Sequence, residues 1–283
     1  MVPIRKEDQQ LRMVGNPVNR LSILCVSMLA FCVLIVVGMV VADIVYLAGR
    51  DLSAIEIWRL FSSEKVLRAL RLSLITSLIT LVLVTITAVP AGYALSRYRF
   101  PGRALINTLV DVPIFLPPVV IGVSLLAFFG SGIGSGVKQM LSGAGISLIS
   151  WIGIVMCQYV ISMSYGIRSV KAAFDSELLS REEIACSLGC TPWQAFMRVS
   201  LPLARPGLIA GCILVWARGL GVFGPLMVFV GTGPRVQVMP TMMWLELSVG
   251  NIEVSLAIAL MMLFMVGAAL GVVHFLVRDR SLL

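Results

Sequence analysis

The sequence predicts an all-α integral membrane protein with about six transmembrane helices. Hydrophobic residues make up 59% of the chain and charged residues 13%, with a mean hydropathy of +0.99, whereas about a quarter of the residues of soluble domains are charged. The apolar residues fall into several runs close to the ~20 residues that a helix needs to cross a bilayer. We expect a cytoplasmic tail over residues 1–20 and a single transmembrane domain over residues 21–283.

The first two expected spans follow a basic N-terminal segment. Residues 1–20 carry four basic side chains. The apolar run over residues 21–45 is longer than the hydrophobic region of a signal peptide and lacks a small-residue cleavage site, so it is expected to remain as the first span. Residues 51–71 interleave apolar and charged side chains, which is typical of an amphipathic helix at the outer interface. The second span is expected over residues 72–95.

The third expected span, residues 104–130, contains three prolines, which are Pro113, Pro117 and Pro118. Prolines free backbone carbonyls inside a membrane, and this is tolerated where a helix faces protein or a water-lined cavity. A glycine-rich outer loop over residues 130–145 should lead into a fourth span over residues 146–167.

A polar loop over residues 168–205 separates the fourth span from a fifth at 206–230. Residues 231–251 should lie outside, and residues 252–277 should form the sixth span. With both termini in the cytoplasm, cytoplasmic segments hold fourteen basic residues and outer segments seven. This excess agrees with the positive-inside rule. The competing topology has a re-entrant or absent first span.

The polar loop begins with the signature of a short helix. Ser180 and Glu183 have the spacing of a capping box, in which each side chain bonds to the backbone N–H of the other residue. Ile184 and Leu188 then share one face at i, i+4 spacing, and Glu182 and Glu183 are expected to face water or a partner.

A second helix start follows a glycine corner. Gly189 can adopt the left-handed conformation that ends a helix. Thr191 is the expected N-cap of the next helix, with Pro192 at its first position and Gln194 completing a capping box. The expected apolar side consists of Trp193, Phe196 and Met197, and Pro202 is expected to end this helix.

The polar loop resembles the EAA loop of the membrane subunits of ATP-binding-cassette importers. The family pattern is Glu-Ala-Ala, three residues, Gly, nine residues, then Ile-x-Leu-Pro; here it reads Glu183-Ile184-Ala185, Gly189 and Val199-Ser200-Leu201-Pro202, with Ile184 replacing the first alanine. The resemblance implies a coupling helix that docks into a cleft of the ATPase subunit. The coupling residues would be Glu182, Glu183, Ile184, Ala185, Gly189, Leu201 and Pro202. The alternative is an ordinary cytosolic helix-turn-helix.

The fifth expected span contains a charge and a cluster of glycines. Gly219, Gly221 and Gly224 satisfy a dinucleotide-binding spacing, but no strand precedes them and they lie inside a span, so the nucleotide interpretation fails. Arg218 lies about 18 Å into the membrane by helical rise. An isolated charge there costs ~2.5 kcal/mol or more, so it should face an aqueous path or pair with an acid, Asp111 being one candidate.

The stretch Ala217-Arg-Gly-Leu-Gly-Val-Phe-Gly224 resembles the Ala-Arg-Ala-Leu-Gly-Glu-Phe-Gly segment of the permeases for molybdate, tungstate and sulfate. The likeness covers residues 72–264, and Val222 replaces the usual glutamate. It also includes Ser96–Arg103, Asp111–Pro118, Met239–Thr241 and Leu245–Asn251. The translocation pathway is expected to include Arg218, Gly219, Gly221, Phe223, Gly224, Asp111 and Pro117.

These resemblances imply a permease subunit of an ATP-driven importer in a bacterial or archaeal cytoplasmic membrane. It would transport an oxyanion delivered by an extracytoplasmic solute-binding protein, in partnership with an ATPase subunit and a second permease subunit, identical or paralogous. Since no Walker A sequence is present, ATP and magnesium are expected on the partner subunit, and no cofactor or nucleic acid is expected here.

Two alternatives remain open from the sequence. One is a permease of the same build for iron, thiamine, a polyamine or an amino acid. The other is a membrane scaffold or membrane enzyme, against which stand the single histidine, His274, and the lack of paired acids in a span. Cys186 and Cys190 have no histidine nearby, so no metal site is expected.

Overall fold

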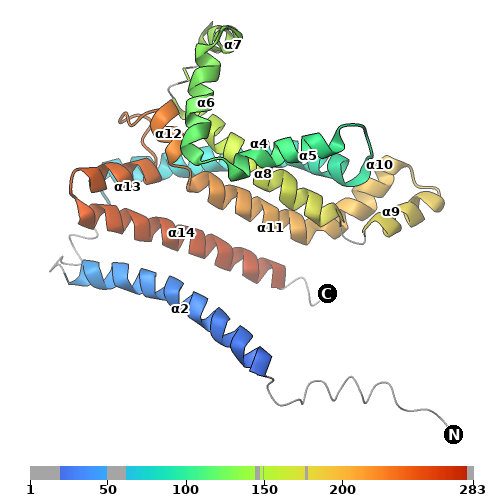
Figure 1. The fold of residues 1–283 in the computed structure, drawn as a ribbon, viewed down its shortest axis with the longest axis horizontal. Helices are drawn as coiled ribbons and strands as arrows, with labels where there is room; N and C mark the ends of the chain where they lie inside the picture. Colours follow the sequence, from blue (N-terminus) through green and yellow to red (C-terminus); the bar gives the residue numbers. More distant parts are fainter. Residues whose placement is uncertain (1–19, 50–61, 144–146, 149, 176–177, 279–283) are drawn as a thin grey trace. The chain divides into compact units, whose positions relative to one another are not determined.

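The computed structural model describes residues 20–49, 62–143, 147–148, 150–175 and 178–278, and the regular structure in these residues is helical throughout (Figure 1). This confirms the predicted fold class. Residues 1–53 form one compact unit and residues 54–283 a second. The helices are α2 (Arg20–Ala48), α4 (Glu64–Arg97), α5 (Arg103–Phe115), α6 (Pro118–Gly130), α7 (Gly132–Gly143), α8 (Trp151–Asp175), α9 (Leu178–Ser187), α10 (Pro192–Ala195), the π-helical turn η2 (Phe196–Ser200), α11 (Leu201–Leu220), α12 (Gly224–Phe229), α13 (Met239–Ser248) and α14 (Ile252–Arg278).

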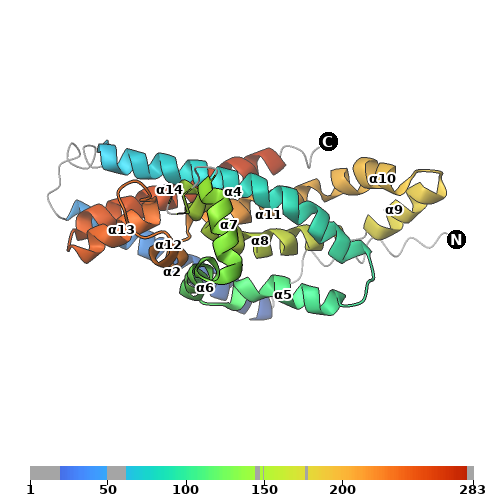
Figure 2. The same cartoon turned by 90° about the horizontal axis from the view of Figure 1, so that it is seen from above.

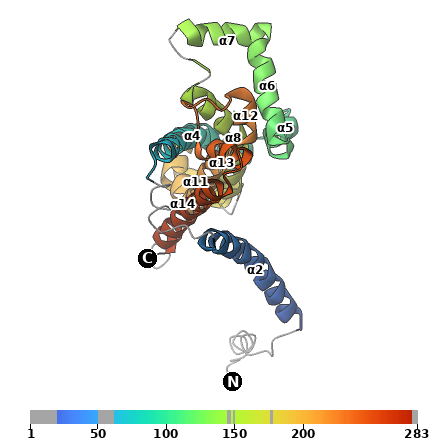
Figure 3. The ribbon, with the colours of Figure 1, turned by 90° about the vertical axis from the view of Figure 1, so that its left-hand side faces the viewer.

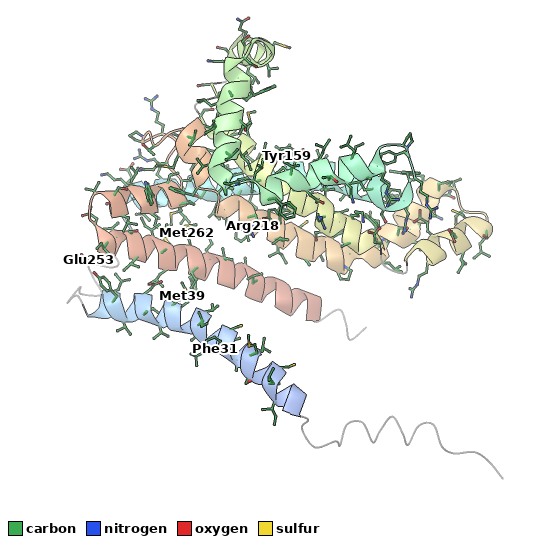
Figure 4. The ribbon with its side chains drawn as sticks, in the orientation of Figure 1. Phe31, Met39, Tyr159, Arg218, Glu253 and Met262 are labelled. Carbon is green, nitrogen blue, oxygen red and sulfur yellow. The ribbon has the colours of Figure 1, made fainter. Side chains whose placement is uncertain are left out.

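The first unit contains α2, which includes the predicted span over residues 21–45. Its stretch Ser22–Leu47 has 26 apolar-rich residues, about 39 Å at the rise of an α-helix and enough to cross the ~30 Å hydrocarbon layer. Side chains such as Phe31 and Met39 project from this helix (Figure 4).

Three helices, α4, α8 and α11, form the centre of the second unit and lie side by side in Figures 1 and 2. Val84, Val170 and Val215 contribute one buried side chain from each helix to their shared core. Gly166 of α8 allows the close approach, since a Cβ there would lie 2.6 Å from Val84 Cγ1 and 3.2 Å from Val215 Cγ2. The α9–α10 corner lies at one end of these helices, and α12 and α13 lie at the other.

A polar seam joins α4 to α8 inside this core. The buried Gln158 amide donates to Thr76 Oγ1 at 3.3 Å, and Thr80 Oγ1 donates to Gln158 Oε1 at 3.0 Å. Ser73 extends the seam by accepting the backbone N–H of Met239 at 2.8 Å. Hydrogen bonds of this kind hold helices together where the surroundings supply no water.

Replacing Gln158 with leucine should lower the free energy of unfolding in detergent by about 0.6–1.7 kcal/mol, the range for interhelical bonds in membrane proteins. The reason is that Thr76 and Thr80 each lose their α8 partner. Thermal unfolding followed by circular dichroism would measure the change. The matched control is Gln139→Leu on the exposed side of α7, which should leave the midpoint unchanged; an equal loss in both variants would contradict the role of the seam.

The number of spans differs from the six expected. Four helices of the described residues are long and apolar enough to cross a membrane, and the α5–α6 pair, bent by 112°, would make a fifth. The 25-residue α8 is not among them, and it carries the polar side chains Gln158, Ser162 and Ser164, which are buried. The six-span count is therefore not confirmed.

Two expected boundaries were wrong. The amphipathic helix over residues 51–71 and the span over residues 72–95 are not separate where described: α4 runs unbroken from Glu64, after Ser63 caps its first turn. Residues 51–61 of that prediction lie outside the described residues. The glycine-rich outer loop contains the helix α7, which leaves α6 at a sharp corner (Figure 3). Gly134 permits this corner by lying against the Phe128–Phe129 backbone.

Candidate functional site

The predicted glycine corner lies between α9 and α10. Gly189 has φ +93°, and the backbone N–H of Cys190 donates to Ala185 O at 3.1 Å while that of Gly189 donates to Cys186 O at 3.0 Å. These two bonds form a Schellman motif, which satisfies carbonyls left free at a helix end. The predicted stop at Gly189 is confirmed.

The second helix begins as predicted. Thr191 Oγ1 accepts the backbone N–H of Gln194 at 3.3 Å, and Gln194 Oε1 accepts the backbone N–H of Thr191 at 3.0 Å. Pro192 occupies the first helical position. The expected cap of the first helix was wrong, because α9 begins at Leu178 and Ser180 lies inside its first turn.

Pro202 does not end the second helix. Instead α10, η2 and α11 run together as one helix over Pro192–Leu220. Within η2, the Leu201 N–H donates to Phe196 O five residues back. This wider turn changes the hydrogen-bond register just before Pro202, which then falls in the first turn of α11, where a missing N–H costs little.

The corner exposes large apolar side chains. Ile184, Leu188 and Trp193 are 59%, 81% and 67% exposed, and Met197 lies on the same exposed segment. In a part of the chain interleaved with charged residues such as Glu183, an apolar patch of this kind is typical of a protein-binding surface.

Glu182 connects the α9–α10 corner to the helical core through hydrogen bonds. It is 9% exposed, and its carboxylate accepts from Tyr93 Oη, from Arg97 Nε at 3.0 Å and from Ser200 Oγ at 2.7 Å. These donors come from α4 and η2, so one side chain of α9 holds both helices that lead into the core. The expectation that Glu182 faces water or a partner was wrong, whereas Glu183 is exposed.

An aromatic cluster surrounds this ion pair. The Tyr93 ring packs edge-on against Phe174 and Phe196, with centroids 5.3 and 4.6 Å away, and the Arg97 guanidinium lies 6.0 Å from its centre. Since Arg97 has a side chain only 8% exposed, the pair is largely removed from water. A charge pair held in this way is strongly destabilising to break.

The glycines of the fifth expected span break it in two. The helix α11 ends at Leu220, Gly221 follows, and α12 begins at Gly224. The continuous span over residues 206–230 was therefore wrong. Gly224 packs against α6, where a Cβ would lie 3.0 Å from Val119 Cγ2, while Gly219 is buried beside Ser162.

A cavity of about 650 Å³ opens beside this break. Gly221 and Phe223 line it together with Trp244 of α13 and Met262 of α14, and the Phe223 and Trp244 rings lie 5.4 Å apart. Met262 is labelled in Figure 4. Of the predicted pathway residues, Gly221 and Phe223 meet in this cavity.

Arg218 projects from the last turn of α11 and is exposed (Figure 4). Its guanidinium lies 4.6 Å from the centre of the Tyr165 ring, and the negative end of the α11 dipole adds a second favourable interaction. Asp111 of α5 does not reach it, because its carboxylate is bound by Arg168 of α8 through two bonds of 2.5 Å. The candidate Arg218–Asp111 pair was wrong. Pro117, another predicted pathway residue, caps α6 at the bend that follows α5.

The family model for inner membrane components of binding-protein-dependent transport systems matches residues 87–281. The chain belongs to this family. A molybdate/tungstate transport system permease protein of Thermococcus kodakarensis is 34% identical over 163 residues, 58% of this chain and 60% of that protein, so the match spans less than two thirds of that relative. A molybdenum transport system permease protein of Mycobacterium tuberculosis is 34% identical over 220 residues, 76% of this chain and 80% of that protein.

The fold of this chain is also similar to that of a solved transporter chain. The structure is a bacterial alginate ABC transporter in complex with a periplasmic protein that holds an alginate pentasaccharide. The TM-score is 0.67 at 21% identity, with 89% of this chain and 92% of that chain covered.

Sequence reasoning missed part of this site. Tyr93 and Arg97 lie 89 and 85 positions before Glu182, so no local spacing relates them. Tyr165 and Arg168 were missed for the same reason. The only available signal was that Arg97 and Arg168 stand at the ends of apolar runs, where the positive-inside rule already accounted for them.

Proposed function

We propose that this chain is the permease subunit of an ATP-driven importer and that an ATPase subunit docks on the α9–α10 corner. The observation that carries this is the combination of an exposed apolar patch at Ile184, Leu188 and Trp193 with the buried Glu182 contacts behind it. A protein bound to the patch would pull on α9, and Glu182 would transmit that pull to α4 and α11.

Transport would follow from alternating access. Closure of two ATPase subunits on ATP would move the corners of two permease subunits and switch the path between outward and inward openings. ATP and magnesium would bind the ATPase subunit. The corner, and with it both termini, would lie in the cytoplasm, and an extracytoplasmic binding protein would deliver the solute to the other face, as the periplasmic protein of the alginate transporter suggests.

The proposed solute is a tetrahedral oxyanion of the molybdate, tungstate or sulfate type. Two relatives are named for molybdate/tungstate and molybdenum, and the cation of Arg218 is exposed beside the α11–α12 break. The fold alone does not identify the solute, since a transporter of a polysaccharide has a similar fold. Uptake of radiolabelled molybdate and sulfate with each candidate binding protein would test the assignment, and uptake only of an unrelated solute would overturn it.

Replacing Glu183 with arginine should weaken ATPase attachment and lower uptake at least tenfold, about 1.4 kcal/mol or more of lost binding. The reason is that Glu183 is exposed on the proposed docking helix, where its charge can meet the partner. Co-purification of a tagged ATPase subunit from detergent would measure attachment.

The control is Glu64→Arg, the same charge reversal at the start of α4, where the side chain is 86% exposed and pairs with Arg68 at 2.6 Å one turn along the same helix. It should leave attachment and uptake unchanged. If Glu183→Arg left both unchanged in a well-expressed protein, the corner would be a simple connection between helices and the coupling proposal would fail.

A further inference from the structure

A second cavity, of about 480 Å³, lies between α5, α8 and α11. Its lining includes Phe115, Tyr165, Arg168, Ser169 and Leu214. Two guanidinium groups border it: Arg168 lines it directly, and Arg218 lies over the ring of Tyr165. Since Leu214 and Arg218 are four residues apart on α11, they share a face.

The cations continue along α8 in a row. Tyr165, Arg168 and Lys171 are spaced by three residues, so each is a neighbour of the next in steps of about 4.5 Å, in a row that winds around the helix. A smaller polar cavity, of about 150 Å³, adjoins Arg168 and is lined by Asp111, Lys171 and Asp175. Arg168 is thus shared by both cavities.

The balance of charge changes along this row. Arg218 makes no ion pair among the described residues. Arg168 is bound by Asp111 at 2.5 Å, and Lys171 is bound by Asp175 at 2.5 Å. Asp175 is the last residue of α8, at the end toward α9, and Asp111 lines the same small cavity as Lys171 and Asp175. A site that conducts an ion must attract it and still let it leave, which a competing carboxylate at each later cation achieves.

We propose that Arg218, Arg168 and Lys171 form an anion path, in which Arg168 receives the anion and Asp111 displaces it toward the α9 end. This rests on the proposed function, because it assigns a route to the oxyanion of that proposal. The side chain of Arg168 is 59% exposed and that of Asp111 is 15% exposed, so the guanidinium has room for an anion beside the fixed carboxylate. The path takes small oxyanions, which bind the remaining N–H groups of Arg168, because Asp111 occupies its Nε and Nη2.

The first test measures the local electrostatic potential and needs no knowledge of the solute. Ser169→Cys is introduced into the full-length chain after the six native cysteines are replaced by alanine. The labelling rate of this introduced thiol is compared for a negatively charged and a positively charged methanethiosulfonate reagent. Arg168→Gln should lower the ratio of negative to positive labelling about tenfold, as expected for a unit charge a few ångströms away. Asp111→Asn should raise the ratio.

Two further variants control this test. Arg168→Lys keeps the charge and should keep a ratio near the parent value even if the ion pair is weakened. Ser248 on α13 is exposed, and Arg168→Gln should not change the labelling ratio of a Ser248→Cys thiol. The proposed path would be overturned if Arg168→Gln left the labelling ratio of the Ser169→Cys thiol unchanged, or if neither reagent labelled that thiol.

The second test measures uptake of radiolabelled molybdate and sulfate by the assembled importer. Arg168→Gln should lower uptake at least tenfold while ATP hydrolysis stimulated by the binding protein continues, and Asp111→Asn should slow uptake by delaying release. Equal uptake in the parent and Arg168→Gln would overturn the path. If the parent carries neither anion, the oxyanion assignment fails, and the labelling ratio still decides whether this face of α8 is an anion path.

Discussion

Replacing Glu182 with alanine is expected to destabilise the protein by about 3–5 kcal/mol, because it leaves the charge of Arg97 buried without a partner. The same change removes the contacts of α9 with Tyr93 and Ser200. Uptake should fall by more than tenfold even in protein that still folds, since the corner would no longer pull on α4 and η2. Unfolding in detergent and solute uptake, both normalised to the amount in the membrane, would measure the two effects.

The adjacent Glu183→Ala is the matched control for stability. It removes the same carboxylate one position along the helix but from an exposed site, where substitutions usually change stability by less than about 0.5 kcal/mol. A Glu182→Gln variant keeps the side-chain volume and the hydrogen bonds from Ser200 while removing the charge, so it should lie between the two. If Glu182→Ala were as stable as Glu183→Ala, the buried ion pair would not hold the corner.

The second large effect is expected at the contact between the two broken spans. Replacing Gly122 of α6 with alanine should cost about 1–3 kcal/mol, the usual cost of overpacking. A Cβ at this position would lie 2.8 Å from Pro225 Cα and 3.0 Å from Pro225 O of α12. Both are backbone atoms, so relief requires α6 and α12 to move apart. Thermal unfolding in detergent would show the loss.

Gly130 provides a control on the same helix. It ends α6, and a Cβ added there would meet nothing within 4 Å, so Gly130→Ala should be neutral or slightly stabilising, as alanine favours a helix. A Gly122→Ala protein that unfolds at the same temperature as Gly130→Ala would show that α6 and α12 do not pack as described.

Local chemistry explains which parts of the structure the sequence could predict. The Thr191 capping box and the stop at Gly189 each depend on residues within four positions, and both are confirmed. The α5–α6 break falls at the consecutive prolines Pro117 and Pro118, which were visible in the sequence. A single proline is a weaker signal, because Pro113 and Pro206 lie inside helices.

The remaining features depend on packing between distant segments. Glu182 and Glu183 look alike in sequence, and only the approach of α4 buries the first and leaves the second exposed. The expected pairing of Asp111 with Arg218 rested on charge alone. In the structure, α5 packs on α8, and Asp111 forms its ion pair with Arg168. A wider turn lets the helix continue past Pro202, and neither that turn nor its position has a local signal.

The unbroken helix over Pro192–Leu220 has a mechanical consequence. Its 29 residues measure about 44 Å, so a tilt of about 7° around one end would displace the other by about 5 Å, close to the length of one helical turn. Its far end is Arg218 and the glycine break. A small rocking movement at the α9–α10 corner would therefore displace Arg218 far enough to move its guanidinium away from the Tyr165 ring.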